Sequence, residues 1–488
     1  MKKLISVFIL LTIICLQVSA QKFKVSYSSE LIQEDFTGNI ILYLSKDNKS
    51  PKDIIVGLQL TPVYRIVADN LKAGEVALFD DHSISYPVEL SNIERGEYYA
   101  QVVFDRNLGG QSIASSVGNI YSIPVKVNLS KDFDHEYDLK ADQIIEEVPF
   151  KGTEFLKELS VRSKLLSDFH KKEIFVNAAV SLPKEYYENP DAQYPVIFSI
   201  FGFGGSYKTH SGKGKYKFTH IGDSPVIVVY LDGNCPEGHS TYANSDVNGP
   251  WGDALVKEFI PALNEKYRTN NAMFLFGHSS GGWSSLWLQI NYPKIFAGTW
   301  SSAPDQVDFR NYQNKNIYES KSMFYDEQGN LFSDFTIAGR FPIVSSKDFY
   351  RIEKVIYRGT QMNSFDAVFG GYDQKGNRIR LVNLPSGEIN SNALPLWKRF
   401  DISLLLRENW DDLKDDLEGK IRVSIGESDN FHLQHSVHLL DNEMKKLIAD
   451  IEFGYFPGDH FTVFTKEYQK RGQEFLEKCY KNWLDENI

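Results

Sequence analysis

The segment FGHSSGGW, residues 276–283, is the clearest indication of the fold in this sequence. The apolar run AMFLF leads into it, and SSLWLQI follows with apolar residues at helical spacing. Gly277, Ser279 and Gly281 fit the pattern G-x-S-x-G, in which a serine occupies a sharp turn between a strand and a helix. Larger neighbouring side chains would collide there, so glycines flank the serine. The segment therefore predicts an exposed serine nucleophile at the end of a buried strand.

A serine hydroxyl reacts well only when a base removes its proton and a carboxylate orients that base. In a fold with such a serine turn, the acid and then the histidine follow along the chain. His460 is the predicted base, because it lies in the glycine turn PGDHF directly after the strand-like IEFGYF. Asp429 is the predicted acid, because GKIRVSIGESDNF puts it just beyond the preceding strand. Glu427 and Asp459 remain alternatives for the acid.

Acyl transfer also needs backbone N–H groups directed at the oxyanion. We expect one from Ser280, directly after the nucleophile, and a second from Phe203 or Gly204 in the glycine-rich stretch after YPVIFSI. Trp251 and Tyr242 are candidate substrate contacts, because aromatic side chains commonly line ligand sites, although Trp251 fits a core position equally well.

Three further histidines, His432, His435 and His438, are spaced by three residues and resemble a metal site on a helix. Neither HExxH nor CxxC accompanies them, so the spacing favours an ordinary helix and its entry. The sequence accordingly predicts no metal and no cofactor.

The chain divides by pattern into an all-β part and an α/β part. Residues 21–130 contain short alternating segments separated by turn residues, which is typical of a small immunoglobulin-like β-sandwich with an accessory role. Residues 131–170 predict an acidic linker and then a helix. In residues 171–488 buried strands alternate with helical runs, which predicts a mostly parallel sheet covered on both faces.

Residues 306–398 interrupt that alternation with a stretch rich in Tyr, Asn, Gly and Phe. So long an irregular segment inside an α/β domain is usually a lid or an inserted cap. We therefore expect it to cover the site that the sheet presents.

Residues 1–20 have two lysines, a short apolar run and the small-residue ending VSA, a pattern typical of a secretory signal peptide. We expect cleavage after Ala20 and export to the bacterial periplasm or the medium. No later apolar run reaches 18 residues, so no membrane span is predicted. Cys235 and Cys479 are too far apart to indicate a disulfide framework, and whether they pair stays open.

The chain is acidic, with 53 Lys and Arg against 64 Asp and Glu and a formal net charge of -11. Without a long basic block, it is a poor partner for nucleic acid and for anionic membranes. Its composition, 42% hydrophobic and 14% aromatic, supports packed cores and argues against a disordered chain. The expected partner is a small-molecule or glycan-linked ester, and the sequence leaves the oligomeric state open.

With these motifs identified, residues 170–488 resemble the esterase D-like family of α/β-hydrolases, which is related to feruloyl, acetylxylan and siderophore esterases. The resemblance lies in VNAAVSLPKEYYENPDAQYPVIFSIFGFGGS, VNGPWGDALVKEFIPALNEKYR, FGHSSGG, GKIRVSIGESDNFHL and PGDHF. It implies an α/β-hydrolase fold and a triad of Ser279, Asp429 and His460.

The leading hypothesis is a secreted serine esterase that cleaves a carboxylic ester, on carbohydrate or with a phenolic acyl group, through an acyl-enzyme. One alternative is an acyltransferase that uses an alcohol in place of water. A second is a secreted glycan-binding protein on an inactive hydrolase scaffold, against which the complete set of Ser279, Asp429 and His460 argues.

Overall fold

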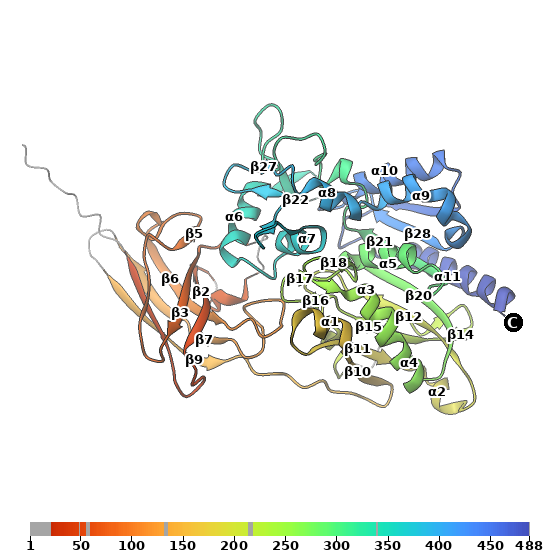
Figure 1. Ribbon diagram of the computed structural model, residues 1–488, viewed down its shortest axis with the longest axis horizontal. Helices are drawn as coiled ribbons and strands as arrows, with labels where there is room; N and C mark the ends of the chain where they lie inside the picture. Colours follow the sequence, from red (N-terminus) through yellow and green to blue (C-terminus); the bar gives the residue numbers. More distant parts are fainter. Residues whose placement is uncertain are drawn as a thin grey trace, which may run out of the picture.

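The computed structural model describes residues 21–47, 49–54, 59–130, 135–212, 218–337 and 340–487. The predicted signal peptide, residues 1–20, lies outside the described residues. Figure 1 shows an all-β N-terminal part beside a larger α/β part, with the C-terminal helix α11 (Lys466–Asn487) at the far end. The predicted succession of an all-β region and an α/β region is confirmed.

A sheet of eight strands forms the centre of the α/β part within the described residues. In spatial order its strands are β10 (Leu156–Ser163), β11 (Ile174–Ser181), β15 (Ile227–Leu231), β12 (Tyr194–Ile200), β20 (Thr269–Ser279), β21 (Gly298–Pro304), β28 (Ile421–Gly426) and β29 (Ile451–Phe456). All neighbours from β15 to β29 are parallel, whereas β11 is antiparallel to both of its neighbours. The prediction of a mostly parallel sheet in an α/β-hydrolase-like fold is therefore confirmed.

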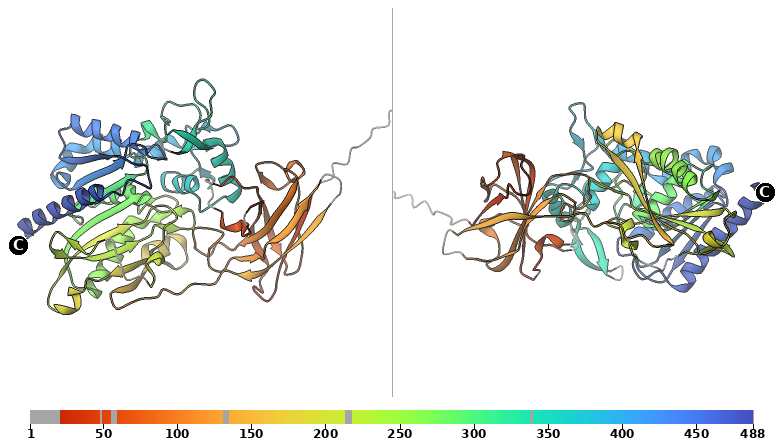
Figure 2. Two further views of the ribbon diagram at one scale, coloured as in Figure 1. Left: turned by 180° about the vertical axis from the view of Figure 1, so that it is seen from behind. Right: turned by 90° about the horizontal axis from the view of Figure 1, so that it is seen from below.

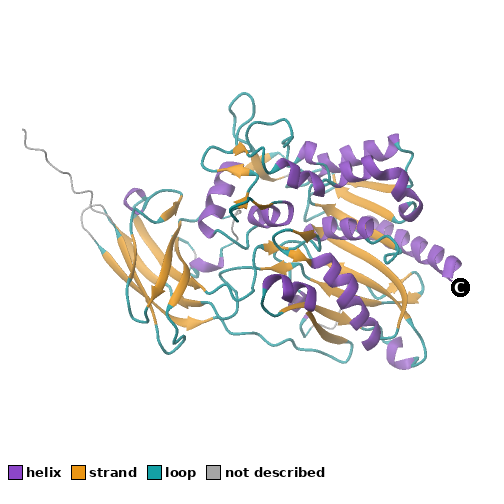
Figure 3. Ribbon diagram, viewed as in Figure 1, coloured by secondary structure: helices purple, strands orange, loops and turns teal. Residues whose placement is uncertain are grey.

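All residues of β12 and β15 are buried, which explains the continuous apolar character of these two strands. In β12, Val196 and Phe198 face a cluster beneath the helices of one side, and Ile197 faces a second cluster beneath α11. Figure 3 shows the helices of the first side, which are α1 (Lys164–His170), α3 (Trp251–Ala254), α4 (Ile260–Lys266), α5 (Ser280–Asn291), α9 (Ile402–Leu417) and α10 (Leu433–Lys446).

Short elements complete the connections of the α/β part. They are α2 (Glu185–Glu188), the π-helical turn Leu255–Phe259 between α3 and α4, and the pairs β13 (His220–Ile221) with β14 (Ser224–Pro225), β16 (Asn234–Cys235) with β17 (Gly238–His239) and β18 (Asn244–Ser245) with β19 (Gly249–Pro250). Cys235 and Cys479 are both free, buried thiols in separate apolar clusters. Among the helices that the structure describes, none has the length and apolarity needed to cross a membrane.

The N-terminal part is one connected sheet of nine strands within the described residues. The strands are β1 (Lys22–Tyr27), β2 (Phe36–Ser45), β3 (Val63–Leu71), β4 (Ala77–Phe79), β5 (Ile84–Tyr86), β6 (Gly96–Asp105), β7 (Ile120–Ser122), β8 (Val125–Leu129) and β9 (Glu136–Ile144). β3 contacts β4 although the two are distant in the strand order, so the sheet curls around a core that includes Phe23, Leu42 and Phe104. The all-β character is confirmed, and the immunoglobulin-like arrangement stays a prediction.

The structure corrects the linker and helix predicted for residues 131–170. β9 pairs in parallel with β1 in the N-terminal sheet, and β10 forms an edge of the second sheet, so among residues 135–170, which the structure describes, only α1 is helical. β9 is hard to recognise in the sequence because only Leu139 and Ala141 of its residues are buried. In β10, Leu156 and Leu159 are three residues apart, a spacing that also fits a helix.

The insertion, residues 306–398, lies between β21 and α9 and is more regular than expected. It contains β22 (Ser333–Ile337), β23 (Phe341–Ser345), α6 (Ser346–Ile356), α7 (Gln361–Phe369), β24 (Gly371–Tyr372), β25 (Arg378–Ile379), β26 (Val382–Asn383), β27 (Glu388–Ile389) and α8 (Leu394–Trp397). On α6, Ile352, Val355 and Ile356 pack against Tyr43 and Val63 of the N-terminal sheet. The views of Figure 2 agree that the insertion lies between the two sheets, so α6 fixes the N-terminal part to the rest of the protein.

Candidate active site

Ser279 occupies a strained turn between β20 and α5. Its φ of 61° and ψ of -127° lie outside the regions that side-chain-bearing residues favour, a conformation that costs about 1–3 kcal/mol. A Cβ atom on Gly277 would overlap the carbonyl of Gly281, and one on Gly281 would overlap the carbonyl of Ile200. The glycines are therefore required by close backbone contacts, and the turn projects the Ser279 side chain beyond the carboxyl end of β20.

Asp429 follows β28 and His460 follows β29, and the two side chains meet beyond the ends of these strands. The His460 Nδ1–H donates to Asp429 Oδ2 at 2.7 Å, and the backbone N–H of Phe431 donates to Asp429 Oδ1 at 2.9 Å. Both side chains are almost completely buried. Because Nδ1 is held by the carboxylate, Nε2 is the ring nitrogen that can accept a proton from a serine.

The two alternatives to Asp429 as the acid, Glu427 and Asp459, are bonded to other groups. Glu427 contacts His438 at 3.2 Å, and the Asp459 carboxylate accepts hydrogen bonds within its own turn, including one of 2.8 Å from the Thr462 hydroxyl. The geometry therefore favours Asp429 as the partner of His460.

The charge state of His460 depends on this surrounding. Burial, the largest single effect, lowers the pKa of the imidazole, but the carboxylates of Asp429, Asp305 and Asp459 together outweigh it and raise the pKa. A raised pKa favours the imidazolium that forms when a base accepts a proton. The site is thus suited to stabilise a proton on His460 during a reaction.

The loop after β12 lies directly against Ser279. A Cβ atom on Gly202 would lie only 3.1 Å from the Ser279 Cβ atom, so glycine lets the loop approach Ser279. Phe203 lines the same cavity as Ser279, whereas Gly204 lines a neighbouring cleft. Of the two predicted donors in this loop, Phe203 is therefore the better placed to join Ser280 at an oxyanion.

Asp305, which was not predicted from the sequence, is a second carboxylate beside Ser279. Its carboxylate accepts hydrogen bonds from Ser279 Oγ at 3.5 Å and from Ser280 Oγ at 2.5 Å. Burial raises its pKa to about 6, and the nearby Asp429 adds to the effect. In this structure the Ser279 hydroxyl thus points to Asp305 rather than to His460. A polar residue directly after the predicted strand GTWSSAP was the available signal, because such strand ends gather at one edge of a parallel sheet.

A cavity of about 360 Å³ opens over Ser279 and His460. Its lining includes the polar side chains Asp305, Gln306, Gln313 and Gln361 and the aromatic side chains Phe203, Phe349, Phe365, Phe431 and Phe461. Within the described part of the chain, Gln313 Oε1 is buried with no hydrogen-bond partner. Three of these side chains, Phe349, Gln361 and Phe365, come from α6 and α7 of the insertion. These three residues could not be predicted from the sequence, because the insertion shows no clear helical pattern that would place them.

The predicted substrate contacts Trp251 and Tyr242 are wrong. Both are buried in the apolar cluster beneath α3 and α4, where their rings meet edge to face with centroids 6.1 Å apart. The Tyr242 hydroxyl donates to the carbonyl of Asp232 at 2.5 Å. Neither residue lines the cavity, because a local aromatic pattern does not distinguish a ligand wall from a core.

His432, His435 and His438 lie at the start of α10, as an ordinary helix and its entry predict. In the residues described here, no group of three or more His, Cys, Asp or Glu side chains is arranged to hold a metal ion.

A family model described as "Putative esterase" matches residues 173–460. This span includes Ser279, Asp429 and His460 as well as the loop that carries Phe203. None of the curated proteins compared with the sequence matches it.

Several solved structures are similar in part. A ferulic acid esterase is 13% identical and covers 68% of this chain and 100% of its own, with a TM-score of 0.41. An S-formylglutathione hydrolase from Agrobacterium tumefaciens is 14% identical and covers 69% of this chain and 96% of its own, with a TM-score of 0.37. The fluorophosphonate-binding serine hydrolase F (FphF) of Staphylococcus aureus is 14% identical and covers 67% of this chain and 99% of its own, with a TM-score of 0.40.

Proposed function

This chain belongs to the Esterase family and is a carboxylic-ester hydrolase, and we propose that it is an exported serine esterase that works through an acyl-enzyme. The observation that carries the mechanism is the strained turn at Ser279 beside a cavity that also contains His460, whose Nδ1–H donates to Asp429 at 2.7 Å. Export rests on the signal-peptide pattern of residues 1–20.

In the first half of the reaction the Ser279 hydroxyl turns from Asp305 to His460, and Nε2 takes its proton. Ser279 Oγ then attacks the ester carbonyl carbon, and the backbone N–H groups of Ser280 and Phe203 stabilise the oxyanion. The carbon–oxygen bond to the alcohol breaks, and the alcohol leaves with the proton from His460.

In the second half a water molecule attacks the carbonyl of the acylated serine. His460 takes the proton of that water and returns a proton to Ser279 Oγ as the acid leaves. Asp429 keeps its negative charge throughout and stabilises the imidazolium in both halves.

The walls of the cavity indicate the kind of acyl group. The phenylalanines offer flat apolar surface, and Gln306, Gln313 and Gln361 offer amide groups to hydroxyl substituents. A hydroxylated aromatic acid can contact both kinds of side chain, whereas a purely aliphatic chain leaves the buried Gln313 amide oxygen unpaired. We therefore propose a phenolic ester as the preferred acyl donor.

The decisive experiment is hydrolysis of p-nitrophenyl acetate and methyl ferulate by the protein that begins at Gln21, compared with Ser279→Ala. We expect turnover of both esters and a loss of at least about 10⁴-fold in kcat in the variant. A fluorophosphonate probe followed by peptide mass spectrometry should label Ser279. Ser160→Ala, an exposed serine in β10, is the matched control and should keep full activity. Turnover that survives in Ser279→Ala would contradict the mechanism.

A further inference from the structure

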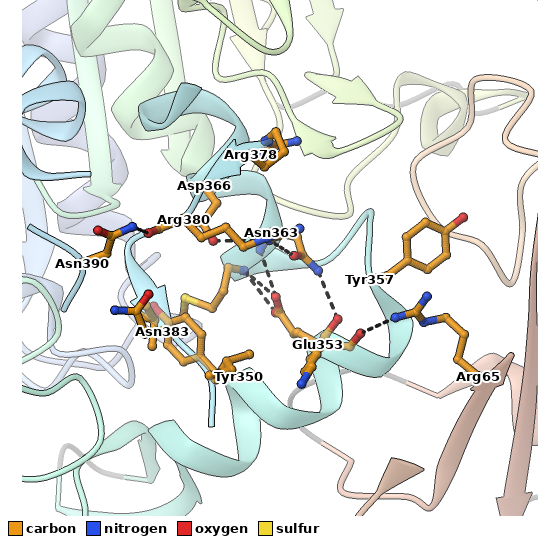
Figure 4. A pocket seen from close by; sticks show the side chains of 14 residues that line it. Arg65, Tyr350, Glu353, Tyr357, Asn363, Asp366, Arg378, Arg380, Asn383 and Asn390 are labelled. Carbon is orange, nitrogen blue, oxygen red and sulfur yellow. Dashed lines mark hydrogen bonds and ion pairs between the residues drawn. The ribbon is translucent and has the colours of Figure 1, made fainter. Parts of the chain in front are cut away.

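A second cavity, of about 420 Å³, lies where the insertion meets the N-terminal sheet. Figure 4 shows the side chains that line it, which come from β3 and, in the insertion, from α6, α7, β25, β26 and the residues beside them. Although the chain as a whole is acidic, four of the described lining residues are cations and two are carboxylates. The cations are Arg65, Lys354, Arg378 and Arg380, and the carboxylates are Glu353 and Asp366.

The two carboxylates compensate these cations only in part. The Glu353 carboxylate accepts hydrogen bonds from the backbone N–H groups of Met362 and Asn363 at 2.9 and 3.0 Å. Burial raises the pKa of Glu353 to about 7, so much of its population carries no charge at neutral pH. Burial also raises the pKa of Asp366, whose carboxylate contacts Arg380 at 3.4 Å. The lining of the cavity therefore carries a net positive charge.

Arg378 contributes buried donors that the described residues leave unused. Its Nη1 atom lies 3.3 Å from Glu237 Oε2, which does not line the cavity. Its Nε and Nη2 atoms are buried and have no hydrogen-bond partner within the described part of the chain. Buried charged donors usually have a partner in native proteins, because an unmade hydrogen bond there is costly. Nε and Nη2 share one edge of the planar guanidinium, which can bind two oxygens of one carboxylate or phosphate.

Arg65 is a second cation with remaining donor capacity. Its Nη1 atom donates to Asn39 Oδ1 at 2.7 Å, and its guanidinium lies over the Tyr357 ring, 5.2 Å from the centroid. Its Nε atom is buried and, among the residues that the structure describes, has no hydrogen-bond partner. Burial lowers the pKa of Arg65, because its surroundings do not fully compensate the charge. An anion in the cavity would supply that compensation from the side of β3.

The remaining lining indicates a small organic anion. Tyr350 and the apolar side chains of Met362, Val382 and Leu384 offer surface to a carbon skeleton. A cavity of about 420 Å³ is within the usual range for small-molecule sites. A large polyanion is disfavoured, because the formal net charge of the chain is -11 and would repel it.

Helix α7 separates this cavity from the catalytic one. Gln361 and Phe365 of α7 line the catalytic cavity, whereas Met362, Asn363 and Asp366 of the same helix line the cationic cavity. A ligand in the cationic cavity therefore leaves the space over Ser279 free, and its binding can be measured independently of the catalytic residues.

We propose that the cationic cavity is a binding site for a small organic anion, whose carboxylate or phosphate group binds the Nε–Nη2 edge of Arg378 and is also attracted by Arg65. Such a ligand joins the insertion to the N-terminal sheet, because Arg378 belongs to β25 and Arg65 to β3. The inference goes beyond the proposed esterase function and does not depend on it.

The test is calorimetric titration of the protein that begins at Gln21 with inorganic phosphate, with citrate and with uncharged glycerol, at constant ionic strength in Tris chloride. We expect heat of binding from phosphate, from citrate or from both, which tells a phosphate site from a carboxylate site, and none from glycerol. Arg378→Gln should weaken the Kd of the anion about tenfold or more, because two charge-assisted hydrogen bonds are lost. Arg471→Gln removes the same charge from an exposed ion pair on α11 and should leave Kd unchanged.

Two further variants complete the test. Arg65→Gln replaces Arg378→Gln if circular dichroism shows that the latter fails to fold, and it should also weaken Kd. His460→Gln removes the histidine from the catalytic cavity and should leave Kd unchanged. The proposal is overturned if neither anion binds, if Arg378→Gln and Arg471→Gln bind equally well, or if binding is lost in His460→Gln and kept in Arg378→Gln. Ester turnover does not enter this measurement, so its absence would leave the result unaffected.

Discussion

Two buried polar clusters in this protein differ in the groups that bind an aspartate carboxylate. One cluster lies at the catalytic edge of the sheet and the other at the domain interface. At the interface, Asp105 is bound by the Arg358 guanidinium, the Tyr357 hydroxyl and the Asn119 amide. At the catalytic edge, the Asp305 carboxylate accepts hydrogen bonds from the hydroxyls of Ser279 and Ser280 and, among the described residues, forms no ion pair with a lysine or arginine. Both carboxylates are almost completely buried.

Their pKa values move in opposite directions. Burial alone would raise the pKa of Asp105, but the hydrogen bonds and charge of Arg358 hold it below its usual value. For Asp305 burial dominates, and its pKa rises to about 6. A guanidinium compensates a buried carboxylate fully, whereas neutral hydroxyls do so only in part. The fully paired cluster stabilises the fold, whereas the carboxylate of the incompletely paired cluster, Asp305, can gain or lose a proton near pH 6.

The largest effect is expected from Asp429→Asn, which changes the catalytic cluster without changing its shape. Without the carboxylate, His460 loses the partner that fixes its tautomer, and kcat should fall about 10⁴-fold. The His460 pKa, now raised, should drop, so the acid limb of the remaining activity moves to lower pH. Steady-state kinetics across pH measure both effects. Glu427→Gln is the control, and a similar loss there would refute the assignment of Asp429.

Asp105→Ala tests the interface cluster. It leaves the Arg358 guanidinium buried without a counter-charge, and the free energy of unfolding should fall by about 3–5 kcal/mol. Because the pKa of Asp105 is lowered in the folded state, its stabilisation is complete above the unfolded pKa and is lost as pH falls through the folded pKa. The difference between variant and wild type in urea unfolding should therefore shrink in acid.

The control for this prediction is Arg471→Ala, which removes an exposed ion pair with Glu467. It should leave the unfolding midpoint unchanged within error. If the two variants behave alike, burial is not what distinguishes the interface pair.

Asp305→Asn should have a smaller effect of the opposite sign. The folded pKa of about 6 lies above the unfolded value, so the wild-type protein loses stability as pH rises towards 6. The asparagine variant lacks this loss and should be more stable than wild type at pH 8 by about 1–3 kcal/mol, and equal to it near pH 4. Urea unfolding at the two pH values measures the difference. A variant that is less stable at pH 8 would show that Asp305 is compensated as well as Asp105.

Trp251→Phe should have the smallest effect on catalysis, because Trp251 lies in an apolar core and belongs to neither of the two polar clusters. We expect KM and kcat for methyl ferulate to stay within about twofold while the melting temperature falls. Phe365→Leu, in the aromatic wall of the cavity, is the matched aromatic substitution and should raise KM. A rise in KM with Trp251→Phe would restore the original prediction of a substrate contact.

Much of the site could be predicted because its residues follow strand ends in a fixed order. The turn at Ser279 has a local pattern, Asp429 follows the buried strand β28, and His460 follows the half-buried edge strand β29. Asp305 also follows such a strand, but its closeness to Ser279 depends on the pairing of β20 with β21, which no local pattern reveals.

Other features lay beyond the sequence for physical reasons. The bonds of Arg358 join residues about 250 positions apart in the chain, as its contacts with Asp105 show. β9 and β10 present weak patterns because one is largely exposed and the other forms a sheet edge. The prediction that Trp251 and Tyr242 contact substrate failed because burial, not residue type, decides which aromatic rings a ligand can reach.

The order of strands also has a consequence for biosynthesis. β20 and its serine turn precede β28 and β29 in the chain, and β29 completes one edge of the sheet. A growing polypeptide that has reached β21 already holds the nucleophile and the loop after β12, but neither the acid nor the base. In the proposed mechanism a nascent chain that ends before His460 therefore lacks the base, and its ester cleavage should be as weak as that of a His460 variant.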